Sequence, residues 1–134
     1  YINLQVVKFI EKKIVSSLKK SKTKFPLAKI LILGLAYKKN LDDYRESASL
    51  KLLDLLKNKG IKKIKLYDPH FNKNNIPKKI DLLKNLTKKD LIHSDLVLLM
   101  TDHDCFDYKF IQRYSKKIID CRGKFSVSEK VIRG

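Results

Sequence analysis

A short apolar run followed by a charged loop is the feature that most restricts the fold of this chain. Ile30–Leu33 is a run of four apolar residues, the pattern of a strand covered on both faces. Gly34 ends the run, and charged residues resume at Lys38. Because ligands in open α/β sheets bind outside the carboxyl ends of the strands, this loop has the location of a binding site as well as its polar chemistry.

The loop matches neither of the common glycine-rich phosphate motifs. A dinucleotide fingerprint needs G-x-G-x-x-G, but Ala36 and Lys39 stand at the second and third glycine positions after Gly34. The P-loop pattern G-x-x-x-x-G-K-[ST] is absent as well. Cationic side chains could take the place of the missing glycines, with Lys38 meeting a diphosphate as a point charge and Arg45 as a planar fork.

Periodicity predicts helices alternating with strands along the rest of the chain. We expect an amphipathic helix over 2–20, with Val7, Ile10, Ile14 and Leu18 on its apolar stripe, and a polar linker over 21–26. A second helix is predicted from an Asp43 N-cap, with Glu46 completing a capping box, to about Lys59. The remaining predicted elements are strands over 63–67, 95–100 and 117–121, helices over 87–93 and 106–114, and a turn at Asp68-Pro69. This order predicts an α/β fold, namely a three-layer Rossmann-like domain with a mainly parallel sheet.

Length and charge limit the function classes. The 134 residues amount to one domain, and no apolar run approaches the ~18–20 residues of a membrane span. The net charge of +17, from 31 basic and 14 acidic residues, would suit a nucleic-acid surface. The lysines are nevertheless scattered through every segment and outnumber the arginines, which favours a general lysine bias instead.

Because the chain starts at Tyr1 and has Met100 as its only methionine, we expect it to be a fragment.

The two cysteines predict neither a disulfide nor a metal site. Cys105 and Cys121 are not in a C-x-x-C arrangement, and zinc needs more ligands at closer spacing. Cys121 ends an apolar strand and is predicted to be a small buried filler.

Four segments, in order along the chain, resemble one known family. These are Gly34–Ser47 (GLAYKKNLDDYRES), Tyr67–His70 (YDPH), Leu96–His103 (LVLLMTDH) and Ile118–Arg122 (IIDCR). Together they are similar to the C-terminal, UDP-binding domain of the UDP-glucose/GDP-mannose dehydrogenases. The resemblance is closest to the branch that acts on UDP-N-acetylglucosamine or UDP-N-acetylmannosamine. It implies that residues 1–24 are the end of a central dimerisation helix with its linker, and that 25–134 form the nucleotide-sugar-binding domain.

The resemblance also implies roles for individual residues. Tyr37, Lys38 and Arg122 would bind the nucleotide sugar. Arg45 would reach the NAD, although an ion pair with a neighbouring carboxylate is the competing interpretation. Thr101, Asp102 and His103 would line or shape the site. His103 is not predicted to be a catalytic base, because no nucleophile or metal cluster accompanies it.

Family members oxidise C6 of a nucleotide-linked sugar from alcohol to carboxylate with NAD, and they supply uronic acids for surface polysaccharides. The resemblance therefore implies a cytoplasmic, homodimeric oxidoreductase whose catalytic residues and NAD-binding half lie outside this chain, which would be inactive alone. Two other interpretations remain open: a stand-alone nucleotide- or nucleic-acid-binding Rossmann-like module, and a non-catalytic dimerisation remnant.

Overall fold

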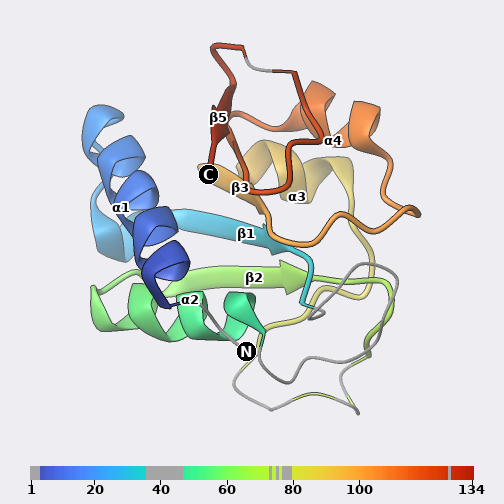
Figure 1. Cartoon of the computed structure of the whole chain (residues 1–134), viewed down its shortest axis with the longest axis horizontal. Coiled ribbons are helices and arrows are strands. Elements are labelled where there is room, and N and C mark those ends of the chain that lie inside the picture. Colours follow the sequence, from blue (N-terminus) through green and yellow to red (C-terminus); the bar gives the residue numbers. More distant parts are fainter. Residues whose placement is uncertain (1–3, 36–46, 73, 75, 77–79, 127) are drawn as a thin grey trace.

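The computed structural model describes residues 4–35, 47–72, 74, 76, 80–126 and 128–134 (Figure 1). The helices in these ranges are α1 (Leu4–Lys20), the short 3₁₀ helix η1 (Phe25–Leu27), α2 (Ala48–Asn58), α3 (Lys88–His93) and α4 (Tyr108–Tyr114). The strands are β1 (Lys29–Leu33), β2 (Lys63–Tyr67), β3 (Leu96–Leu99), β4 (Ile118–Asp120) and β5 (Val131–Arg133).

The strands form one parallel sheet in the order β2-β1-β3-β4-β5. Helices α1 and α2 lie on one face of this sheet, and α3 and α4 lie on the other (Figure 1). The predicted three-layer α/β fold with a parallel sheet is therefore confirmed. Because the strands are parallel, their carboxyl ends all lie on one side of the sheet, which we call the carboxyl edge. This is the side where a binding site is predicted.

Each face of the sheet carries its own apolar core. Alternate residues of β1 divide between them, with Ile30 and Ile32 packing toward α1 and α2, and Leu31 and Leu33 toward α3 and α4. All four residues of β3 are buried, as expected of a central strand covered on both faces. Because both of their faces are covered, the central strands contain uninterrupted runs of apolar residues.

The edge strand β2 has a different pattern because only one of its faces is covered. Ile64 and Leu66 are buried in the core beneath α1 and α2, while Lys63 and Lys65 between them are exposed. Residue Leu82 forms an isolated parallel bridge with Leu66, so a short segment extends the sheet only beside the carboxyl half of β2. The face of β2 above Lys63 and Lys65 is left open.

Several local predictions are confirmed. Helix α1 buries the expected stripe of Val7, Ile10, Ile14 and Leu18, and this stripe joins the core formed by α2 and the sheet. The helix predicted over 87–93 is present as α3, and Thr87 and Asp90 form a reciprocal capping box at its start. The division of the chain at residue 24 stays a prediction.

Two predictions about elements are wrong. A single helix from Asp43 to Lys59 does not form, because the backbone of Ser47 is extended and caps a helix that begins at Ala48. Asp43 and Glu46 themselves lie outside the described residues. The fifth strand, β5, was not predicted, since the three residues Val131–Arg133 are too few to give a strand pattern alone and form a strand by pairing with β4.

Candidate functional site

The carboxyl end of β1 is packed tightly against the segment that follows β3. Gly34 has a φ of +99°, and a Cβ added there would lie 2.5 Å from both the backbone nitrogen and the Cβ of Thr101. Its amide donates to the Tyr67 carbonyl at 2.9 Å, and its carbonyl accepts from the Ser49 hydroxyl at 2.6 Å. The lone glycine is therefore explained by backbone conformation and close packing, with no need for a pyrophosphate.

A buried aspartate joins the ends of β1, β2 and β3. The Asp68 carboxylate accepts from the Leu35 amide at 2.8 Å, lies 2.7 Å from His103 Nε2, and accepts from the His70 amide at 2.9 Å. The side chains of Asp68 and His103 are both 0% exposed. Leu35 is the last described residue before the loop 36–46, so Asp68 holds the backbone from which that loop starts.

Hydrogen bonding keeps the Asp68 carboxylate ionised. Burial alone would raise its pKa, but the hydrogen bonds from His103, Leu35 and His70 hold the pKa below its ordinary value of 3.8. An ionised carboxylate only accepts, so His103 Nε2 carries the proton of this contact. The turn predicted at Asp68-Pro69 is present at residues 69–70, but the sequence pattern gave no sign that the Asp68 side chain joins three strand ends.

Aromatic rings surround His103 on its remaining sides. Its ring centroid lies 4.4 Å from that of His70 and 5.4 Å from that of Phe106. The Tyr108 hydroxyl donates to the His103 carbonyl at 2.8 Å. Burial, followed by the nearby Asp102, raises the pKa of Tyr108 to about 12, so the hydroxyl stays a neutral donor. His103 is therefore a buried residue that supports the carboxyl edge of the sheet.

A second buried aspartate organises the end of β4. One Asp120 carboxylate oxygen accepts from the amides of Arg122 and Gly123, at 3.0 and 2.8 Å. The other accepts from the Phe125 amide at 2.8 Å and from Arg133 Nη1 at 3.0 Å. Asp120 therefore sets the course of the backbone that carries Arg122. The I-D-x-R pattern contained this residue, but only the structure shows its role.

Arg122 lies at the surface of this edge, in contact with Asp102. Its Nε donates to Asp102 Oδ1 at 3.1 Å, and Lys124 Nζ lies 3.8 Å from the other oxygen of the same carboxylate. The Arg122 side chain is 44% exposed and that of Asp102 only 14%. No contact in the described part of the chain occupies the two Nη groups of Arg122, which leaves a planar pair of donors for an anion.

The remaining predicted site residues divide into two groups. Thr101 is buried against Gly34 and donates its amide to the Leu33 carbonyl, so it forms the wall between β1 and β3. Tyr37, Lys38 and Arg45 lie outside the described residues. The structure thus brings together Thr101–His103 and Arg122 at one edge of the sheet.

The thiol near this edge is not activated. Burial, followed by Asp120, raises the pKa of the Cys121 thiol to about 12, so the thiol is not an activated nucleophile. Among the residues whose placement is described, no group of His, Cys, Asp or Glu side chains could hold a metal ion. In the same ranges, no helix is long and apolar enough to cross a membrane.

Comparison with known proteins identifies the family. Residues 31–127 match the UDP binding domain of the UDP-glucose/GDP-mannose dehydrogenase family. The chain belongs to this family. The matched region contains all four motif segments described above, which confirms the resemblance.

Relatives and solved structures agree with this assignment. The UDP-N-acetyl-D-mannosamine dehydrogenase of Methanococcus vannielii is 32% identical over 108 residues, which are 78% of this chain and 23% of that protein. The structure of the UDP-D-ManNAc dehydrogenase from Pyrococcus horikoshii superposes with a TM-score of 0.72 at 26% identity, covering 94% of this chain and 29% of that one. The UDP-N-acetyl-mannosamine dehydrogenase of Staphylococcus aureus shares the fold, with a TM-score of 0.71 at 23% identity, covering 97% of this chain and 30% of that one. The chain therefore spans about a quarter of the length of these relatives.

Proposed function

We propose that this chain binds the UDP part of a nucleotide sugar, within an NAD-dependent 6-dehydrogenase that oxidises the sugar C6 alcohol to a carboxylate. One observation carries the proposal: Arg122 is held at the carboxyl edge of the sheet by Asp102 and Asp120, and no contact with a described residue occupies its two Nη groups. A guanidinium presented in this way suits bidentate contact with a diphosphate. Tyr37 and Lys38 would complete the contacts to the nucleotide sugar.

The substrate class follows from the relatives. Those of Methanococcus vannielii and Pyrococcus horikoshii are both UDP-N-acetyl-D-mannosamine dehydrogenases. We propose a UDP-N-acetylhexosamine as the substrate and a uronic acid for surface polysaccharide as the product, formed in the cytoplasm.

The cofactor would be bound mainly outside this chain. NAD would supply the hydride acceptor, but the sequence contains no G-x-G-x-x-G, so its residues do not fit a complete NAD site. Arg45 is the one residue proposed to reach the cofactor. The chain alone would bind the nucleotide without transferring a hydride.

The test is a calorimetric titration with UDP, UDP-N-acetylglucosamine and ATP. We expect UDP and its sugar to bind more tightly than ATP, and Arg122→Ala to weaken UDP binding about ten- to a hundredfold, as for loss of one charge-assisted contact. Arg122→Lys should recover only part of the affinity, because an ammonium cannot form the planar fork.

Arg113→Ala is the matched control, since it removes an exposed arginine near the end of α4, at the opposite edge of the sheet. UDP binding that falls equally in Arg113→Ala and Arg122→Ala would contradict the site. Binding of ATP as tight as that of UDP, and weakened to the same degree by Arg122→Ala, would favour a general nucleotide module.

We also propose that a second copy of the chain covers the exposed apolar residues of α1. Leu4, Val6 and Phe9 are 48%, 51% and 52% exposed, beside the buried stripe of the same helix. Apolar side chains of this size on a structured helix favour burial against a matching surface. Sedimentation should show a dimer for the wild-type chain and a monomer for Phe9→Asp; a wild-type monomer at high concentration would sink the proposal.

A further inference from the structure

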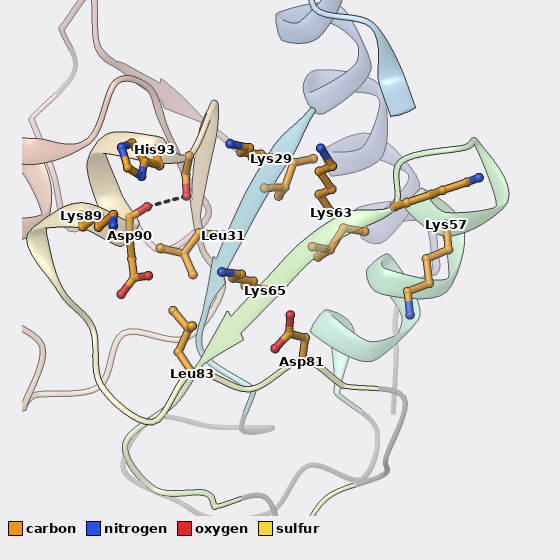
Figure 2. Close-up of a pocket in the computed structure, with 14 residues that line it drawn as sticks. Lys29, Leu31, Lys57, Lys63, Lys65, Asp81, Leu83, Lys89, Asp90 and His93 are labelled. Atoms are coloured by element: carbon orange, nitrogen blue, oxygen red, sulfur yellow. Dashed lines mark hydrogen bonds between the residues drawn. The ribbon is translucent and has the colours of Figure 1, made fainter. Parts of the chain in front are cut away.

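A hollow in the described part of the structure lies away from the carboxyl edge. It is a cavity of about 610 Å³ beside the amino halves of β1 and β2, reaching across to α3 (Figure 2). We call it the amino-end cavity. Its lining includes Lys29 and Leu31 of β1, Lys63 and Lys65 of β2, and Lys89 of α3.

The cavity exists because the helical layer stops short of the edge strand. Helix α3 has six residues and covers β1 and β3 but not β2. The segment around Leu82 pairs only with the carboxyl half of β2. The alternation of β2 then places Lys63 and Lys65 on the uncovered face. The hollow is therefore a consequence of the fold and not of one flexible side chain.

Positive charge converges on this hollow from separate elements. The lining contains six lysines and two aspartates; the lysines are Lys29, Lys57, Lys62, Lys63, Lys65 and Lys89. One aspartate, Asp90, is already engaged, because its carboxylate accepts from the amide and the hydroxyl of Thr87. The cavity therefore carries a net positive charge that its own carboxylates do not balance.

The lysines of the two strands differ from the cations at the carboxyl edge in their partners. Lys29, Lys63 and Lys65 form no ion pair with any carboxylate in the described ranges. At the carboxyl edge, by contrast, Arg122 and Lys124 both meet Asp102. Like charges that line a concave surface with low-dielectric walls raise the local concentration of anions.

The walls between the lysines are apolar. Figure 2 shows Leu31 and Leu83 in the cavity between α3 and β2, near Lys65. Leu31 belongs to the core beneath α3 and α4, and Leu83 packs against that core. A volume of this size falls within the roughly 300–1,000 Å³ of small-molecule sites. The cavity thus combines several cations with an apolar surface that a flat group could cover.

We propose that the amino-end cavity binds a small polyanion carrying at least two phosphate groups, at a site separate from the UDP site at the carboxyl edge. Lys29, Lys63 and Lys65 contact the phosphates. Both a free oligophosphate and a nucleoside phosphate carry this chemistry. Only the nucleoside phosphate has a flat group that can cover the apolar wall of Leu31 and Leu83, so the two ligands would differ in affinity.

The test is a titration of the 134-residue chain with inorganic triphosphate and, separately, with ATP, at physiological ionic strength. The variant is Lys63→Gln/Lys65→Gln, and the matched control is Lys109→Gln/Lys116→Gln, which removes two exposed lysines that do not line the cavity. We expect the first variant to bind triphosphate at least tenfold more weakly and the control to change by less than twofold. ATP binding tighter than triphosphate would identify a nucleoside phosphate as the ligand, and equal binding would identify a free oligophosphate.

Three outcomes would overturn the proposal. The first is that neither anion binds at millimolar concentration, and the second is that both double variants lose affinity equally. In either case the lysines would serve only to protect an exposed strand edge from pairing. A short RNA that binds more tightly than triphosphate and is weakened equally by both variants would indicate diffuse nucleic-acid binding.

Arg122→Ala separates this proposal from the proposed function. We expect it to weaken UDP binding and to leave triphosphate binding within twofold of the wild type. Loss of triphosphate binding in Arg122→Ala, but not in Lys63→Gln/Lys65→Gln, would place the anion at the carboxyl edge and would overturn the separate site. Backbone amide shifts on titration provide the second readout, and they should be largest in the amino halves of β1 and β2.

Discussion

The two ends of the parallel sheet carry charge in opposite ways. At the carboxyl edge, Asp68 and Asp120 are buried and each accepts several hydrogen bonds, and Asp102 pairs with two cations. At the amino-end cavity, lysines of β1 and β2 face a hollow and form no ion pair with a described carboxylate. The first arrangement fixes the backbone and orients one arginine. The second leaves charge available for a ligand.

This difference shows that net charge alone does not distinguish the proposed nucleotide-sugar site from the other end of the sheet. A lysine-rich surface places cations at both ends of the sheet, and a hollow lined by six lysines lies at the amino end. The carboxyl edge is set apart by buried carboxylates that order the strand-end loops. No buried side-chain nitrogen or oxygen among the described residues lacks a hydrogen-bond partner. Preorganisation, more than the number of charges, marks the proposed nucleotide-sugar site.

The strongest test of the carboxyl edge is Asp68→Ala. The substitution leaves the Leu35 amide and His103 Nε2 without their acceptor, so we expect the free energy of unfolding to fall by about 3–5 kcal/mol. Asp95→Ala is the control at the amino end, because that carboxylate accepts from the Lys29 amide in a more exposed position. The control should cost about 1 kcal/mol in urea denaturation.

The pH dependence of the same pair of proteins checks the cause. The folded-state pKa of Asp68 is lowered, so its contribution to stability is present above the unfolded pKa and is lost as the pH falls through the folded pKa. The difference in unfolding free energy between wild type and Asp68→Ala should therefore shrink in acid. A difference that stays constant down to pH 2 would show that the carboxylate charge is not what joins the three strands.

The next largest effect is expected at Gly34. Gly34→Ala forces a side chain into a positive φ and against the backbone of Thr101, and we expect a loss of about 2–4 kcal/mol. Gly60 has a φ of +92° with nothing within 4 Å of an added Cβ. Gly60→Ala therefore measures the cost of the positive φ alone, which we expect to lower the free energy of unfolding by about 1 kcal/mol. Equal losses in thermal or urea unfolding would show that the close approach of β1 to Thr101 is unimportant.

The smallest effect is expected at the amino-end cavity. Lys63→Gln/Lys65→Gln should change the unfolding free energy by less than about 0.5 kcal/mol, because both side chains are exposed and have no described carboxylate partner. Urea denaturation at low and at physiological salt measures this. A loss of 2 kcal/mol or more would mean that these lysines stabilise the edge strand, and the contrast between the two ends of the sheet would fail.

Much of the fold follows from patterns within short segments. The apolar run Ile30–Leu33, the stripe of α1 and the Thr87–Asp90 capping box all form as their local sequences predict. The helix after the first loop begins later than predicted, because Ser47 competes with Asp43 as a cap and no local rule ranks the two. Strand β5 depends on pairing with β4, and a three-residue segment carries no period of its own.

The sequence by itself determined the α/β class and the positions of Thr101–His103 and Arg122 just beyond the carboxyl ends of buried strands. Only the tertiary structure decided that Asp68 holds His103 and the Leu35 amide, and that an uncovered edge strand creates a cavity at the other end. The partners of Asp68 lie 35 and 33 positions away along the chain. Such contacts form because β1 lies between β2 and β3 in the sheet. The order of the strands arises from the packing of the whole core, so it cannot be inferred from residues that are neighbours in the sequence.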